Sequence, residues 1–160
     1  MKNKFRDLRI DMIKEIELDV DYSISFGDVK SGLCWLAVGI TEQHYEDSKI
    51  FDGKKKEGIE TINVKIIRFN NLFRLLEIKK TTNTIELVPL NLIEMCSLGK
   101  SLTGILQTVV SVGFTYESRN GMHHFPALKA RDGMSPSALK GYWDSCPFYP
   151  QAFYFAVKEL

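Results

Sequence analysis

Alternation of apolar and polar residues is strongest between residues 15 and 26. Apolar side chains occupy the even positions (Ile16, Leu18, Val20, Tyr22, Ile24, Phe26), and acidic or serine side chains occupy the odd ones (Glu15, Glu17, Asp19, Asp21, Ser23, Ser25). Strict period two is typical of a strand with one buried face and one solvated face. The pattern therefore predicts a long strand over 15–26, ended by the turn residues of GDVKSG.

Three later segments resemble strands separated by short turns. They span 61–69, 72–80 and 84–90, with Asn70-Asn71 in the first gap and Thr81 to Asn83 in the second. Sequential strands at this spacing predict an antiparallel meander. The apolar run 33–40 favours a central strand, although a buried helix fits the same pattern. The closing residues QAFYFAVKEL predict a final strand.

Helical signals are fewer. Phe5, Leu8 and Met12 have helical spacing within 3–13, and the spacing of Ile105, Val109 and Val112 favours a helix from about Ser101 to Val112. Ser135-Pro136 combines a preferred N-cap with a preferred first helical residue, which predicts a short helix from 136 to about 145. Together the segments predict an α+β fold. We expect a single domain over 1–160, with an antiparallel sheet of about five or six strands and two or three helices on one face.

Charge and cysteine content narrow the function classes. The 21 basic and 20 acidic residues give a net charge of +1, and the basic residues are scattered, so nucleic-acid binding is not favoured. No apolar run approaches the ~20 residues that span a bilayer, and the charged N-terminus lacks a signal-peptide core. Three separated cysteines without a Cys-x-x-Cys pair favour neither disulfides nor a zinc ribbon. The sequence thus predicts a cytoplasmic protein with no membrane association.

Candidate chemistry concentrates between Tyr116 and Pro150. Guanidinium groups bind phosphate or carboxylate, imidazoles titrate near neutral pH, and aromatic faces stack on bases. These properties suit a small anionic, nucleotide-like ligand. The predicted ligand-binding residues are Arg119, His123, His124, Arg131, Tyr142, Trp143 and Asp144.

Complete catalytic and metal signatures are missing from the sequence. The Gly99-Lys100-Ser101 run has Glu94 where a phosphate-binding loop needs its first glycine. Adjacent residues in extended backbone point in opposite directions, so His123-His124 makes a poor chelating pair. A zinc site would need ligands from His44, Cys146 or Asp144. We therefore assign no catalytic residue, metal or cofactor, and we expect binding rather than catalysis.

Two binding modes and one enzymatic alternative remain open. The carboxylates of Glu15, Glu17, Asp19 and Asp21 would form a row about 7 Å apart on one strand face. Such a row is either a solvated face, neutralised by neighbours such as Lys65, Arg74 or Lys79, or the docking edge of an interaction or inhibitor module. The second mode is capture of the anionic ligand. The alternative is a hydrolase with His123 or His124 as general base, oriented by Asp132 or Asp144. A homo-oligomer and a bacterial or phage accessory role are compatible with either mode.

Overall fold

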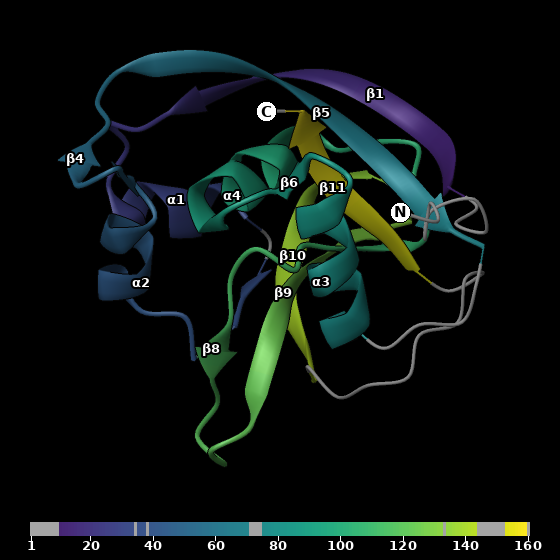
Figure 1. Ribbon diagram of the computed structural model, residues 1–160. Helices are drawn as coiled ribbons and strands as arrows, with labels where there is room; N and C mark the ends of the chain where they lie inside the picture. Colours follow the sequence, from purple (N-terminus) through teal and green to yellow (C-terminus); the bar gives the residue numbers. More distant parts are fainter. Residues whose placement is uncertain are drawn as a thin grey trace.

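The strands of the protein form one large sheet and one small ribbon. The computed structural model describes residues 10–33, 35–37, 39–70, 75–132, 134–143 and 153–159. Nine of the described strands form a sheet in the order β1-β5-β11-β7-β9-β10-β2, in which β6 also pairs with β11 and β8 with β9 (Figure 1). The bounds are β1 Ile10–Asp21, β2 Trp35–Leu36, β5 Ile59–Phe69, β6 Leu87–Pro89, β7 Thr108–Val110, β8 Tyr116–Glu117, β9 His123–Arg131, β10 Met134–Trp143 and β11 Phe153–Glu159. The ribbon pairs β3 (Ile50–Phe51) with β4 (Lys54–Lys55).

The predicted antiparallel sheet of five or six strands is wrong. The sheet is mixed, because β11 runs parallel to β7 and β10 runs parallel to β2. The described residues also include four short helices rather than two or three: α1 Phe26–Gly32, α2 Glu42–Asp47, α3 Leu75–Thr84 and α4 Leu92–Ser101. Strands β2 and β6 lie within the predicted strand segments 33–40 and 84–90, but they are much shorter than these segments. Strands β7 and β8 were not predicted, because strands of two or three residues are too short to show an alternating pattern.

The first strand is confirmed, but it ends earlier than predicted. Strand β1 stops at Asp21, whose side-chain carboxylate accepts a hydrogen bond from the backbone N–H of Ser23 at 2.9 Å. Ser25 then caps α1 by accepting from the N–H of Asp28 at 3.2 Å. Local side-chain bonds of this kind compete with a strand ladder. The alternating pattern of apolar and polar residues continues to Phe26, although the strand itself ends at Asp21.

Two other long predicted strands are also confirmed in part. The segment 61–69 lies within β5, and the chain closes with β11. Strand β11 occupies the middle of the sheet, paired with β5 on one edge and with β6 and β7 on the other. The predicted strand over 72–80 is wrong, because Leu75–Thr84 forms α3. Its leucine, glutamate and lysine residues are good helix formers.

The two helices predicted in the second half are also wrong. In place of the helix predicted from about Ser101 to Val112, helix α4 begins at Leu92 and ends at Ser101. It begins there because Asn91 and Glu94 form a capping box, in which each side chain accepts a hydrogen bond from the other residue's backbone N–H at 3.0 Å. The segment predicted as a helix over 136–145 is β10. Asp132 adopts φ 52° at the β9–β10 turn, and Asp-Gly is a strong hairpin signal. The register shift between Met134 and Ala138 is the kind of irregularity that tolerates a proline in a strand.

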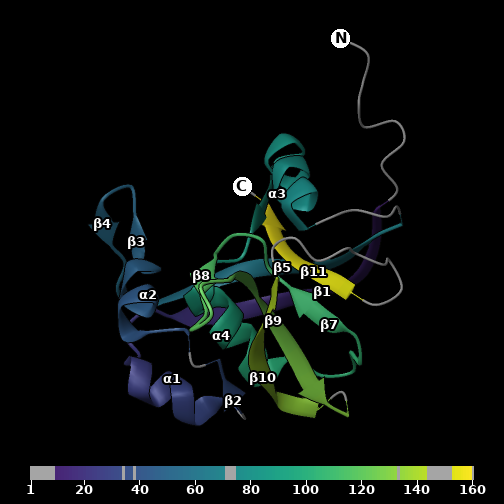
Figure 2. The same ribbon diagram turned by 90° about the horizontal axis from the view of Figure 1, so that it is seen from below.

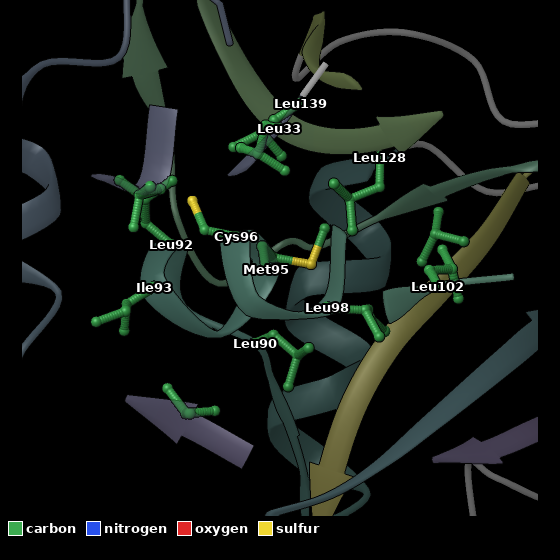
Figure 3. Packing of buried hydrophobic residues seen from close by; sticks show 14 of the residues in the cluster. Leu33, Leu90, Leu92, Ile93, Met95, Cys96, Leu98, Leu102, Leu128 and Leu139 are labelled. Atoms are coloured by element: carbon green, nitrogen blue, oxygen red, sulfur yellow. The ribbon is translucent and has the colours of Figure 1, made fainter. Parts of the chain in front are cut away.

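Both faces of the sheet are covered. Helix α3 lies on one side of β5 and β11, and α1 and α4 lie on the other (Figure 2). Ile78 of α3 belongs to a buried cluster with Phe69, Phe125 and Phe155. The larger cluster surrounds α4, whose Met95 and Leu98 pack in the same core as Leu128 of β9 (Figure 3). The prediction that the helices pack on a single face of the sheet is therefore wrong. None of the described helices is long and apolar enough to cross a membrane.

A buried carboxylate attaches α4 to the central strand. Glu94 is fully buried, and its two oxygens accept hydrogen bonds from the Asn91 backbone and from the ammonium group of Lys158 in β11. A buried charge is tolerated only when its partners satisfy it in this way. The interaction thus links the start of the helix to the middle of the sheet.

Removing this carboxylate should destabilise the whole fold. We expect Glu94→Ala to lower the free energy of unfolding by about 3 kcal/mol, because it deletes a helix cap and leaves the Lys158 ammonium without its partner. Urea unfolding followed by circular dichroism measures this change. Glu42→Ala is the matched control, since Glu42 is also in a first helical turn but is exposed. Equal effects of the two substitutions would contradict the buried linkage.

Candidate functional site

A pocket lies beside the stretch of β10 that has no pairing with β2 among the described residues. Its volume is about 840 Å³, and it lies between the β8–β9 hairpin, β10 and the residues Trp35, Ala37 and Gly39. Strand β2 pairs with β10 only at Ala138 and Leu139, and one further bond joins the Ala37 N–H to the Leu139 carbonyl at 2.9 Å. Beyond this point the described chain leaves β10 and crosses to β8. The pocket occupies the resulting gap.

The ring of Tyr116 closes the inner side of this gap. A Cβ atom added to Gly39 would lie 2.9 Å from the ring, and one added to Gly141 would lie 1.9 Å from its hydroxyl oxygen. Both distances are shorter than real contacts allow, so the ring fits only because both neighbours are glycines. Burial raises the pKa of the Tyr116 hydroxyl, which therefore stays protonated at neutral pH. Tyr116 offers the pocket a neutral phenol.

The imidazole of His124 is oriented by two contacts. Its ring stacks on Tyr116 with centroids 5.5 Å apart and an angle of 21° between the planes. Its Nδ1 atom lies 3.0 Å from the carbonyl oxygen of Met122. A carbonyl only accepts hydrogen bonds, so Nδ1 carries the proton. In the neutral ring, Nε2 is then an acceptor that no described residue occupies.

A row of rings continues from the pocket to α2. Phe114 stacks against Tyr116 at 6.2 Å, and His44 of α2 meets Phe114 edge-on at 5.4 Å. Offset and edge-on ring pairs of this kind are stabilising. The row fixes the orientation of Tyr116, and with it the position of His124.

A tight turn places the guanidinium of Arg119 at the pocket. The Ser118 N–H donates to the Met122 carbonyl at 2.9 Å, and the Gly121 N–H donates to the Ser118 carbonyl at the same distance. Gly121 adopts φ +75°, a conformation that glycine reaches without strain. Arg119 and Asn120 therefore lie at the tip of a well-defined hairpin, and both line the pocket.

The lining is cationic and aromatic. Arg119 and Lys140 are exposed, His124 is partly buried, and Trp35 is 48% exposed. None of the described lining residues is acidic. Clustered positive groups in a concave site attract anions, and an accessible indole ring offers a flat apolar face. The arrangement is suited to a planar molecule that carries a negative charge.

The structure brings two of the predicted site residues together. Arg119 and His124 both line the pocket, whereas His123 is exposed outside its lining, in register with Glu117. Arg131 ends β9, which places its backbone about 23 Å along the strand from His124.

The remaining predicted residues lie at or beyond the end of β10. The backbones of Tyr142 and Trp143 run beside the pocket, since Trp143 is in register with His124. Their side chains, and the whole of Asp144, lie outside the described residues.

The lining residues that were not among the predicted site residues include Trp35, Ser118, Asn120 and Lys140. The Asn120-Gly121 pair is a hairpin signal that could have placed the turn, with Ser118 and Asn120 in it. Lys140 was assigned to a helix that does not exist, so its position at a strand edge could not be foreseen. No local pattern indicates that Trp35 is accessible, because it lies in an apolar run.

Other candidate chemistry finds no support in the described residues. No three His, Cys, Asp or Glu side chains there gather closely enough to hold a metal ion. The Gly99-Lys100-Ser101 run lies at the end of α4 rather than at a helix start, so it lacks the free amides of a phosphate-binding loop. Asp132 follows Arg131 at the far end of β9 and lies too far along the strand to orient His124.

Comparison of the chain with models of known protein families, with curated proteins and with solved structures finds no match. Any functional conclusion therefore depends on the geometry and chemistry of the pocket itself.

Filling the space at Gly141 should disrupt the pocket. We expect Gly141→Ala to displace the Tyr116 ring and to cost about 1–3 kcal/mol of stability, as overpacking usually does. Thermal unfolding measures the loss. Gly27→Ala is the control, because the nearest atom to its added Cβ would lie 3.9 Å away.

A double-mutant cycle identifies the cause. In a Tyr116→Ala background the added methyl group no longer meets the ring, so the cost of Gly141→Ala should fall to the smaller cost of the contact that remains, with the Cβ atom of His124 at 3.0 Å. An unchanged cost in that background would show that the Tyr116 ring is not what requires glycine at position 141.

Proposed function

We propose that this protein binds a small anionic ligand with a planar ring in the pocket between β8, β9 and β10, and that it does not transform this ligand. One observation carries the proposal: Arg119, His124, Lys140 and Trp35 line one pocket, and no described residue of the lining is acidic. A volume of about 840 Å³ lies within the range of small-molecule sites, roughly 300–1,000 Å³.

The anionic group of the ligand would bind Arg119 and Lys140. A guanidinium binds phosphate or carboxylate through two parallel hydrogen bonds, and an ammonium acts as a mobile point charge. Both side chains are exposed and neither has an ion-pair partner among the described residues. They are therefore free to reorient toward a ligand without breaking an existing bridge.

The planar part of the ligand would stack on the indole of Trp35. Aromatic stacking on a nucleobase contributes about 1–3 kcal/mol per base and tolerates different bases. The Nε2 atom of His124 and the Asn120 side chain would add polar contacts. This combination favours a nucleotide-like molecule over an inorganic anion.

The hydrolase alternative has one supporting observation. The Met122 carbonyl holds His124 in the tautomer whose Nε2 atom is able to accept a proton. Among the described residues, however, no carboxylate and no hydroxyl group forms a hydrogen bond with this imidazole. Capture is therefore the better-supported function, and turnover is the outcome that would replace it.

The ligand is best sought first in the purified protein. We expect native mass spectrometry of the freshly purified protein to detect a bound small anion, and mass measurement after denaturation to identify its class. If none is retained, titration calorimetry with adenosine 5′-monophosphate, a nucleoside diphosphate and benzoate provides the probes, with adenosine as the uncharged control. No retained molecule, and no binding of any of the charged probes, would overturn the proposal.

Removing one cation should weaken this binding with little change in stability. We expect Arg119→Ala to lower affinity for the retained ligand or the best probe about tenfold or more, because a charge-assisted pair contributes about 1.5–3 kcal/mol. Lys54→Ala is the control, since it deletes an equally exposed cation on the β3–β4 ribbon.

Capture and catalysis are distinguished by recovering the ligand after incubation. We expect it to be recovered unchanged. Conversion that stops in His124→Ala would establish the hydrolase alternative instead.

A further inference from the structure

Strand β1 forms an outer edge of the large sheet, on the opposite side from the pocket. It pairs with β5 from Ile10 to Asp21, and it has no strand partner on its other side among the described residues. In Figure 1 the two strands run together along the top of the molecule, while the β8–β9 hairpin projects at the bottom. An edge of this length presents a row of free backbone donors and acceptors, which is a template for another strand.

The exposed face of this edge is acidic. Glu15, Glu17 and Asp19 are exposed, while Leu18 and Val20, on the opposite face of the strand, are buried in the core. Glu15 accepts a hydrogen bond from Asn63 and Asp19 accepts one from Thr61, each at 2.5 Å, but neither partner carries a charge.

The cations expected to neutralise this row do so only in part. Lys65 lies opposite Glu15 in register, but it forms an ion pair with Glu159. Lys79 belongs to α3 rather than to a neighbouring strand, and Arg74 lies outside the described residues. Glu17 has no hydrogen-bond or ion-pair partner in the described part of the chain. The row therefore retains most of its negative charge.

A shallow groove runs beside the same edge. It has a volume of about 300 Å³ and lies between the second half of β1 and the end of α4, with Leu18, Ile24, Ser97 and Ser101 in its lining. A strand added to β1 would direct alternate side chains into this groove. Glu17, Asp19 and Asp21 of the β1 segment also line the groove, together with Lys100 of α4.

We propose that the β1 edge binds an extended, basic segment of a partner protein by strand addition. Lysine or arginine at every second position would lie opposite Glu15, Glu17 and Asp19, because the residues on one face of a strand repeat at about 7 Å. Backbone hydrogen bonds to β1 would supply affinity, and the charge pairs would select the partner. This site is separate from the pocket, so it does not depend on the ligand proposed there.

The charges disfavour a second copy of this chain as the occupant. An antiparallel β1–β1 pair centred on Glu17 would place Glu17 opposite Glu17 and Glu15 opposite Asp19. Like charges directly opposite each other destabilise a strand pair. The acidic row thus protects the edge from self-association while leaving it open to a basic strand.

A synthetic peptide tests the proposal. The probe is a nine-residue peptide, acetylated and amidated, in which lysine at the odd positions alternates with threonine. We expect it to bind the full-length protein and to protect from hydrogen exchange those amides of residues 15–19 that point away from β5. Two control peptides should each bind at least about tenfold more weakly: one of the same composition with its lysines grouped at one end, and one with alternate backbone amides methylated.

Charge reversal on the protein provides the matched variants. Glu17→Lys combined with Asp19→Lys should reduce peptide affinity by at least about tenfold. Glu42→Lys combined with Asp47→Lys, which reverses two exposed charges on α2, should change it little. Arg119→Ala should leave peptide binding unchanged, which separates this test from that of the pocket.

Three results would overturn the proposal. Equal binding of the grouped-lysine peptide would mean that only net charge matters. Equal binding of the methylated peptide would mean that no backbone ladder forms. A dimer in light scattering, with the β1 amides that point away from β5 already protected before peptide is added, would show that a second copy occupies the edge.

Discussion

Burial of α4 against one face of the sheet is the constraint on which the rest of the structure depends. Its apolar residues lie in the largest buried cluster, and a Cβ added to Gly99 would lie 2.8 Å from side-chain atoms of both Leu33 and Leu128. The helix therefore approaches β9 as closely as its backbone allows. Glu94 at its start is joined to Lys158 of the central strand, so the axial position of the helix is set as well.

The two proposed sites lie at different edges of the sheet that this helix covers. At one edge, β10 extends beyond its short partner β2, and the unpaired stretch becomes a wall of the pocket. At the other edge, the end of α4 lies beside β1 and leaves a groove along it. Their charges are opposite: the pocket lining carries cations, and the β1 edge carries carboxylates. The net charge of the chain is therefore near zero even though its surface has two regions of opposite charge.

How much could be predicted from the sequence depended on the range of the interactions. Strands β1, β5 and β11 were recognisable because each places alternate side chains in a core, which leaves a periodic pattern. The Asn91–Glu94 capping box marks the start of helix α4, whereas the spacing of Ile105, Val109 and Val112 predicted a helix further along the chain. Strand β10 was predicted as a helix because Ser135-Pro136 is a helix-start signal, whereas the Asp132-Gly133 pair just before it is typical of a hairpin. Local signals conflict at such points, and tertiary pairing decides between them.

The pocket was predictable only where its residues are close in sequence. Arg119 and His124 belong to one hairpin, so they were found together. Trp35 and Lys140 reach the same place through the parallel pairing of β2 with β10, a long-range contact that no local pattern encodes. The converse error was Arg131, which is close to His124 in sequence but far from it along an extended strand.

The three histidine rings of this chain allow the most direct test of the central claim, because they serve as internal controls for one another. Nuclear magnetic resonance of the imidazole signals, during titration with the ligand recovered from the protein or with the best probe, reports on each ring separately. The account predicts that the signals of His124 shift strongly, while those of His123, its exposed neighbour, and His44 of α2 hardly change. Equal shifts of His123 and His124, or no shift of His124 under saturating ligand, would contradict a ligand site in this pocket.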